Sequence, residues 1–168
     1  PRTKDWKKNS FSKINLDSFR KNIDIHLNSF SWISKLIADR ISKSKKGGSI
    51  INLGSIYGIV GQDLNTYLGT DMKESMTYSI IKGGLTNLSR QMASYYGKFN
   101  IRINTVCPGG VEDLKQTSMF KKNYSKKTPL KRLAKPHEVA SAILFLSSDA
   151  SSYITGTSLI VDGGWTAI

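Results

Sequence analysis

The sequence predicts an α/β fold in which helices cover a parallel sheet. Helix-like and strand-like segments alternate along the chain, and the strand-like segments are short continuous apolar runs, as expected of strands buried on both faces. Each run is followed by glycine or small polar residues, in GSIYG, CPGGV and DGGW. Ligands of such sheets bind at the carboxyl ends of the strands, so a functional site is expected at these three segments.

The first predicted element is a long amphipathic helix over residues 17–44. Apolar residues recur there at every third or fourth position, with Asp17 at the start and KSKKGG at the end. The apolar run SIINL at 49–53 lies between glycines and is the first predicted strand. A polar loop containing several glycines follows over residues 54–74.

The second half of the chain repeats this alternation. A long helix is predicted over residues 75–96, followed by the strand IRINTVCPGG, which ends in a Pro-Gly-Gly breaker. Residues 111–130 are rich in lysine and indicate at most one short helix. KPHEVASAILFLSSDAS predicts another helix with Pro136 in its first turn, where proline is tolerated, and TSLIVDGG is the last predicted strand.

Length and composition are typical of one globular domain over residues 1–168. Hydrophobic residues make up 39% and aromatic residues 10% of the chain, which is more than in disordered proteins. No apolar run approaches the length of a membrane span, and PRTKDWKKNSFSK lacks the apolar core of a secretory signal. The single cysteine, Cys107, allows no internal disulfide and fits a reducing, cytoplasmic compartment.

The net charge of +13 raises the hypothesis of nucleic-acid binding. The lysines lie in separated runs, however, and no nucleic-acid motif or aromatic-interleaved basic strand accompanies them. A solvated basic surface is therefore favoured, with an anionic substrate as a further alternative. The runs are Lys7-Lys8, Lys43 to Lys46, Lys121-Lys122 and Lys126-Lys127.

Tyr78 and Lys82 form the most informative pair in the second long helix. Residues four apart lie on one face of a helix, and a neighbouring ammonium favours the phenolate form of a tyrosine. Such a tyrosine can exchange a proton with a carbonyl or alcohol oxygen, and the hydroxyl of Ser55, after the first strand, could bond the same oxygen. The pair by itself also occurs by chance, so its context has to support it. No His/Cys/Asp cluster has the spacing of a metal site.

In this context the chain resembles the short-chain dehydrogenase/reductase family. The matching pieces occur in the order of the family and cover most of residues 17–164: SIINLGSIYGIVG, YSIIKGGLTNLSRQMA, IRINTVCPGGV, KRLAKPHEVASAILFLSSDASSYITG and LIVDGG. The resemblance implies an NAD(P)-dependent oxidoreductase that moves hydride between a nicotinamide and a carbonyl or secondary alcohol. The SIYG strand end resembles members that act on sugars in bacterial surface-glycan and flagellin modification, and other pieces resemble 3-oxoacyl-ACP reductases.

The resemblance also assigns roles to residues. Ser55 polarises the substrate oxygen, Tyr78 is the general acid/base, and Lys82 supports Tyr78 and binds the nicotinamide ribose. The backbone at the end of the second strand flanks the nicotinamide, through Pro108, Gly109 and Val111. Small-molecule substrates and homo-oligomers, as dimers or tetramers, are implied by analogy with the family.

Two local departures from the family pattern concern the substrate side. The catalytic asparagine of the family aligns with His26, with Asn28 as the nearby alternative; a histidine among apolar positions can equally be a satisfied core residue. The segment between Ser55 and Tyr78 is also longer than in most relatives. Its Tyr57, Tyr67 and Asp63 are candidates for sugar contact or for packing of the loop.

The third departure is larger. The fold expected is a Rossmann-like doubly wound parallel sheet that lacks its N-terminal cofactor-binding βαβ part, because no glycine-rich strand-loop-helix precedes residue 17. The run SIINL would then be an open sheet edge, and these residues alone are expected to bind NAD or NADP weakly. The choice between the two cofactors lies in the missing part. A non-catalytic remnant that pairs with other chains is the alternative reading.

Overall fold

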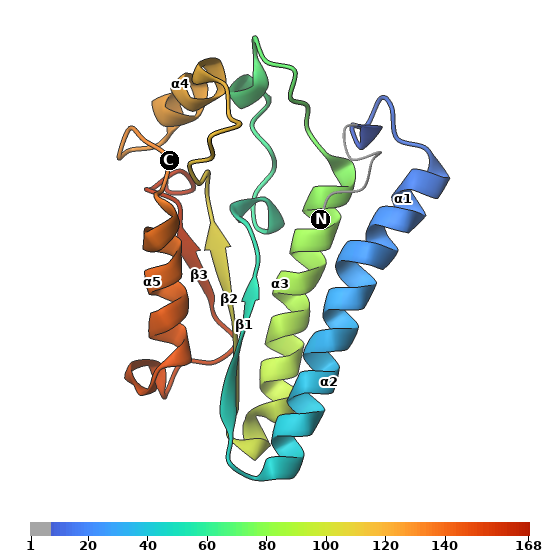
Figure 1. Ribbon diagram of the computed structural model, residues 1–168, viewed down its shortest axis with the longest axis vertical. Helices are drawn as coiled ribbons and strands as arrows, with labels where there is room; N and C mark the ends of the chain where they lie inside the picture. Colours follow the sequence, from blue (N-terminus) through green and yellow to red (C-terminus); the bar gives the residue numbers. More distant parts are fainter. Residues whose placement is uncertain (1–7) are drawn as a thin grey trace.

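The computed structural model describes residues 8–168 as a three-stranded parallel sheet between two layers of helices (Figure 1). One layer contains the long helices α1 to α3, and the other contains α5, so helices cover both faces of the sheet as the sequence predicts. The elements are α1 (Leu16–Ile23), α2 (Ser29–Ser44), β1 (Gly48–Leu53), α3 (Met76–Tyr96), β2 (Ile101–Pro108), α4 (Ser118–Lys127), α5 (Pro136–Ser147) and β3 (Ser158–Val161).

The strands lie in the order β1-β2-β3, with β2 in the middle. Gly48 pairs with Ile101 at one end of the β1–β2 ladder, and Pro108 pairs with Val161 at the end of the β2–β3 ladder. All residues of β2 except Arg102 are buried, as expected of the middle strand of a sheet that is covered on both faces. Within residues 8–168, β1 pairs with β2 alone, so its other edge is open as predicted.

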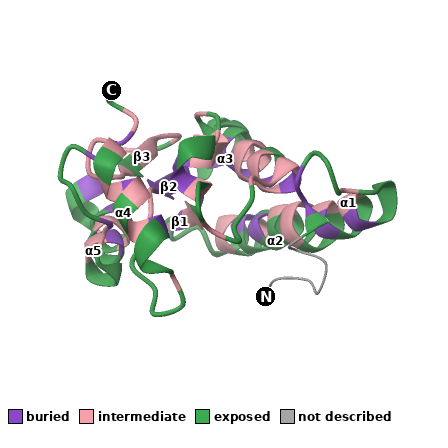
Figure 2. Ribbon diagram, turned by 90° about the horizontal axis from the view of Figure 1, so that it is seen from above, coloured by how far each residue is buried: buried purple, intermediate pink, exposed green. Residues whose placement is uncertain are grey.

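The apolar core is divided between the two faces of the sheet. Figure 2 shows the buried residues along the strands and on the sides of the helices that face them. The cluster beneath α2 and α3 contains Ala38, Ile50, Met92, Ala93, Tyr96, Ile101 and Ile103. The cluster beneath α5 is built on Val106, Val139 and Leu146.

The first long helix differs from its prediction at two points. It begins at Leu16, and the cap is the Asn15 side chain, whose Oδ1 accepts from the Ser18 amide at 2.9 Å, rather than Asp17. The helix is also not uniform, because a π-helical segment, η2 (Asp24–Asn28), separates α1 from α2. A π-helical segment inserts an extra residue into the helical repeat and is frequent at functional sites.

The predicted loop 54–74 contains two short 3₁₀ turns, η3 (Ile56–Gly58) and η4 (Leu64–Tyr67). The lysine-rich stretch contains the single helix α4 that its pattern indicated. No helix in residues 8–168 combines the length and the apolar character that a membrane crossing needs. Of the predicted lysine runs, Lys7 lies outside the described residues.

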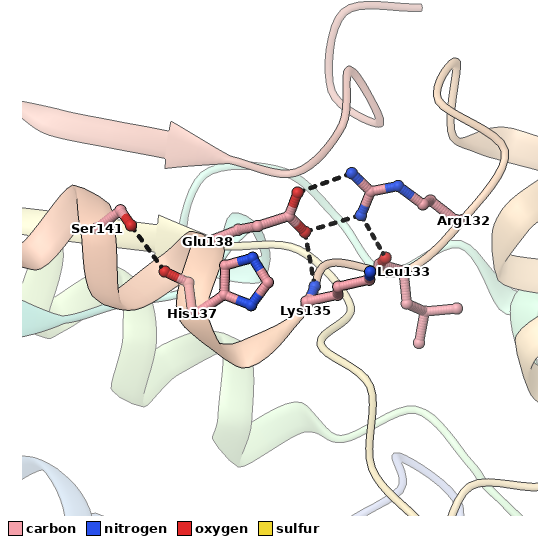
Figure 3. Close-up of polar contacts among 6 residues, drawn as sticks. All are labelled: Arg132, Leu133, Lys135, His137, Glu138 and Ser141. Atoms are coloured by element: carbon pink, nitrogen blue, oxygen red, sulfur yellow. Dashed lines mark hydrogen bonds and ion pairs between the residues drawn. The ribbon is translucent and has the colours of Figure 1, made fainter.

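The start of α5 is held by a bidentate ion pair (Figure 3). Both nitrogens of the Arg132 guanidinium lie 2.7 Å from the Glu138 carboxylate, which also accepts from the Lys135 amide at 2.7 Å. These interactions lower the pKa of Glu138 to about 2, with the hydrogen bond from Arg132 as the largest cause. Pro136 occupies the first turn, as the sequence predicts.

Candidate active site

The carboxyl end of β1 leads directly to Ser55. This residue is 6% exposed, and its Oγ accepts from the Tyr57 amide at 3.2 Å, which caps the turn η3. The Gly54 amide donates to Val106 O at 2.8 Å, so the β1–β2 ladder continues up to Ser55. A serine hydroxyl keeps its own proton while it accepts such a bond, and Ser55 can therefore still donate to a ligand oxygen.

Tyr78 lies in the first turn of α3 and Lys82 one turn later. The Lys82 ammonium lies 5.8 Å from the centroid of the Tyr78 ring and donates to Leu53 O, the last carbonyl of β1, at 2.7 Å. Burial lowers the pKa of Lys82 below its ordinary value. The Lys82 ammonium thus joins α3, at a position next to Tyr78, to the end of β1.

Gly58 lets the turn after Ser55 approach the backbone of α3. A Cβ at this glycine would lie 2.7 Å from the carbonyl carbon and oxygen of Lys82, which is closer than any side chain permits. On another side of α3, a Cβ at Gly84 would lie 3.0 Å from the side chain of Leu27 in the π-helical segment. The glycine of the GG pair that borders a close approach is therefore Gly84, while Gly83 has room for a Cβ, its nearest neighbour being 3.6 Å away.

His26 belongs to the π-helical segment, which packs on α3. Burial lowers the pKa of His26, and the positive charge of Lys82 lowers it further, so the two side chains are electrostatically coupled. Asn28, the alternative in the alignment, is exposed and donates to Asp24 Oδ1 at 3.3 Å on the outer surface. Of the two residues, His26 is the one affected by the charge of Lys82, which contributes to its lowered pKa.

The end of β2 forms the next wall. The Gly109 amide donates to Val161 O at 3.0 Å, and the Gly110 amide donates to the Tyr124 hydroxyl at 2.5 Å. Val111 forms an isolated parallel bridge with Ala134. The hydrogen bonds of this bridge use the backbone of Gly110, Ala134 and Glu112, so the amide of Val111 lies outside them.

The candidate substrate residues Tyr57 and Tyr67 belong to an aromatic cluster above the strand ends. Tyr57 packs edge-on against Trp165 at 5.7 Å between ring centroids, and Tyr67 stacks on Phe120 at 6.4 Å. Burial is the largest cause that raises the pKa of both tyrosines. The packing role that the sequence left open for these residues is therefore realised in large part.

Asp63 is tied to α4 rather than left open in the loop. Its carboxylate lies 3.0 Å from the Lys127 ammonium, which also lies 3.9 Å above the ring of Trp165. Sequence reasoning missed Lys127 and Trp165, because one was part of a lysine run and the other only followed a strand-end glycine pair. It also missed Gln62, for which the sequence carries no signal.

Together these groups can move a proton at a ligand oxygen. A serine hydroxyl, a tyrosine phenol and a lysine ammonium come from elements that meet at the carboxyl end of β1. No group of three or more His, Cys, Asp or Glu side chains within the described residues has the arrangement of a metal site.

Comparison with known proteins identifies relatives along the chain. A family model described as Enoyl-(Acyl carrier protein) reductase matches residues 2–166. Post-translational flagellin modification protein A of Campylobacter coli is 33% identical over 165 residues, which are 98% of this chain and 64% of that protein. L-rhamnose 1-dehydrogenase (NAD(P)(+)) of Azotobacter vinelandii is 32% identical over 161 residues, which are 92% of this chain and 59% of that protein.

A solved structure shows the same fold. It is a short-chain dehydrogenase from Leptospira borgpetersenii with bound NAD+, with a TM-score of 0.86 and 32% identity, covering 94% of this chain and 59% of that one. The chain thus spans less than two thirds of the length of these relatives. With a family match over nearly all of its residues and the expected fold, the chain belongs to the short-chain dehydrogenase/reductase family.

Proposed function

We propose that the protein containing this chain is an NAD(P)-dependent oxidoreductase that interconverts a carbonyl and a secondary alcohol on a small, sugar-like substrate. The observation that carries the proposal is the anchoring of Lys82 beside Tyr78 at the carboxyl end of β1. The relatives support it, because one is named as a sugar dehydrogenase that uses NAD(P)+ and one was solved with NAD+.

The residues present fit the nicotinamide half of the cofactor. The half-buried Lys82 donates to the end of β1, and the Val111 amide lies outside the local backbone bonds at the end of β2. Lys82, Tyr78, Pro108, Gly109 and Val111 would hold this half. Within residues 8–168, no glycine-rich strand-loop-helix is available for the phosphates. When bound, the nicotinamide supplies or accepts the hydride.

The side chains handle the proton. Tyr78 donates it to the carbonyl oxygen during reduction and takes it back during oxidation. Ser55 donates a hydrogen bond to the same oxygen, and the Lys82 ammonium favours the phenolate that Tyr78 becomes after donation. His26, in the π-helical segment that packs on α3, is the candidate to return a proton toward that pair.

Replacement of Tyr78 by phenylalanine tests this mechanism. In the full-length protein, Tyr78→Phe should lower turnover about a thousandfold, because it removes the proton donor, while the affinity for NADH stays within about twofold. The assay follows nicotinamide absorbance with L-rhamnose and related sugars and either NAD+ or NADP+. Tyr95→Phe, an exposed tyrosine at the other end of α3, is the matched control. Turnover retained by Tyr78→Phe would refute the mechanism.

A second candidate is a non-catalytic protein that pairs with other copies or homologues. The open edge of β1 and the missing phosphate site within residues 8–168 favour this reading for these residues in isolation. Fluorescence titration of residues 1–168 with NADH and NADPH measures the affinity that these residues have by themselves. We expect a dissociation constant weaker than about 1 mM, and micromolar binding would contradict this expectation.

Nucleic-acid binding receives no support from the arrangement of the basic residues. The lysines of α4 and those at the end of α2 lie at opposite ends of the molecule (Figure 1). One lysine of α4, Lys127, is engaged by Asp63 and Trp165. The basic charge is therefore spread over the surface and forms no single stripe for a nucleic-acid backbone.

A further inference from the structure

The side-chain amide of Gln62 is bonded to the residue that caps α3. Its Nε2 donates to Ser75 O at 2.8 Å, and its Oε1 accepts from the Ser75 amide at 3.1 Å. Nε2 also lies 3.0 Å from the Ser79 Oγ, one turn farther along the helix. Ser75 in turn caps α3, because its Oγ accepts from the Tyr78 amide at 3.2 Å. Gln62 therefore holds the residue that caps the backbone amide of Tyr78.

A second set of bonds leads from Gln62 toward the strand end. The Tyr67 hydroxyl donates to Gln62 Oε1 at 3.3 Å, and Tyr67 packs against the same aromatic cluster as Tyr57, two residues after Ser55. The amide thus uses both donor and both acceptor positions. Its orientation is fixed, because the Ser75 amide can only donate and the Ser75 carbonyl can only accept.

The first turn of a helix is the part that most needs such support, since its amides have no partners within the helix. In α3 the Met76 amide donates to Asn9 O at 2.9 Å on one side, and Gln62 holds Ser75 on the other. The side chain of Gln62 bonds to Ser75 and Ser79 at the start of α3 and to Tyr67 within the loop 54–74. Gln62 therefore connects this loop to the helix that bears Tyr78.

We propose that Gln62 is a positioning residue for Tyr78, which holds the first turn of α3 in register with Ser55 and with the aromatic wall formed by Tyr57 and Tyr67. The proposal rests on the proposed function, in which Tyr78 is the acid/base. It gives the long segment between Ser55 and Tyr78 a role in catalysis through geometry. A tyrosine displaced by about 1 Å can lose up to about a hundredfold in rate.

The first arm of the test needs no activity. Gln62→Met keeps the volume of the side chain and removes its hydrogen bonds, so amide hydrogen exchange at Ser75 and Tyr78 should become at least about tenfold faster. Asn123→Ala is the matched control, because the Asn123 amide donates to Leu68 O at 2.8 Å and ties the same loop to α4. This control should leave exchange at Ser75 and Tyr78 unchanged. Equal acceleration in both variants would overturn the proposal.

The second arm uses turnover of the full-length protein, with reduced nicotinamide cofactor deuterated at the transferred position. Gln62→Met should lower kcat about tenfold or more, leave KM for the cofactor unchanged and increase the isotope effect on kcat, because the chemical step becomes slower. Partial unfolding would lower kcat without changing the isotope effect. Tyr67→Phe, which removes one bond to Gln62, should change both quantities in the same direction by less.

The two proposals fail in different ways. If Tyr78→Phe is inactive while Gln62→Met keeps the wild-type kcat and isotope effect, the positioning role is wrong and the proposed function stands. If Tyr78→Phe remains active, the acid/base role of Tyr78 is wrong, and with it the catalytic consequence of Gln62.

Discussion

The two long helices on one face of the sheet, α2 and α3, are buried to very different degrees. Eight residues of α3 are buried and include the large side chains Ile81, Leu85, Met92 and Tyr96. The buried residues of α2 are only Ser34 and Ala38. Its larger apolar side chains are exposed, from 46% at Ile37 to 61% at Trp32. The residues described here therefore complete the packing of α3 and leave that of α2 incomplete.

This difference indicates which surfaces depend on further protein. Contiguous exposed apolar residues mark interaction surfaces in soluble proteins, and α2 presents Phe30, Trp32, Ile33, Leu36 and Ile37. The homo-oligomer expected by analogy with the family remains a prediction. We expect its subunits to contact each other through this surface of α2. The helix bearing Tyr78 is, in contrast, fixed by contacts within the chain.

The largest expected effect on stability is seen when a leucine is replaced by alanine in α3, and the same replacement in α2 provides the comparison. Leu85 is 5% exposed and Leu36 is 49% exposed. Leu85→Ala should lower the free energy of unfolding by about 3 kcal/mol, because it removes buried methyl groups and leaves a cavity. Leu36→Ala should cost about 0.5 kcal/mol or less in the isolated chain. Urea unfolding followed by circular dichroism measures both.

The comparison fails if Leu36→Ala is as costly as Leu85→Ala. In that case the outer face of α2 is covered in solution, and the cost should grow with protein concentration. A cost that is independent of concentration would instead indicate that α2 packs against other parts of the same chain.

A smaller effect is expected at the hydrogen bond that joins the two helices. The Tyr96 hydroxyl of α3 donates to Asp39 Oδ1 of α2 at 2.6 Å. Burial, together with the Asp39 carboxylate, raises the pKa of Tyr96 to about 12. Tyr96→Phe should therefore lower the free energy of unfolding by about 1 kcal/mol at pH 8. Tyr95→Phe, at the exposed neighbouring position, should leave it unchanged.

The pH dependence of this bond follows from the direction of the shift. A raised pKa in the folded state means that the contribution of Tyr96 is complete below pH 10, the ordinary value, and is lost as the pH rises toward about 12. Urea unfolding at pH 8, 10 and 11.5 should show the difference between wild type and Tyr96→Phe shrinking. A difference that stays constant up to pH 11.5 would show that the hydroxyl is not bonded to Asp39 in solution.

The regular elements could be predicted because their signals are local. The runs SIINL and IRINTV become the strands β1 and β2, of which β2 is buried except at Arg102, and Pro136 begins α5 as expected. The differences from the prediction lie in the first long helix. The cap of α1 is Asn15, two residues before the predicted start at Asp17, and Asp17 lies in the first turn. The π-helical segment at His26 has no periodic signature in an otherwise regular apolar pattern.

By itself, the sequence determined the α/β class, the order of the elements and the pairing of Tyr78 with Lys82, because helical spacing and apolar runs follow from residues close in the chain. The tertiary structure alone decided that Lys82 bonds the last carbonyl of β1 and that Gln62 holds the cap of α3. It also decided that Tyr57 and Tyr67 pack with Trp165 and Phe120. These contacts join segments far apart in sequence, and their geometry exists only once the sheet has brought the strand ends together.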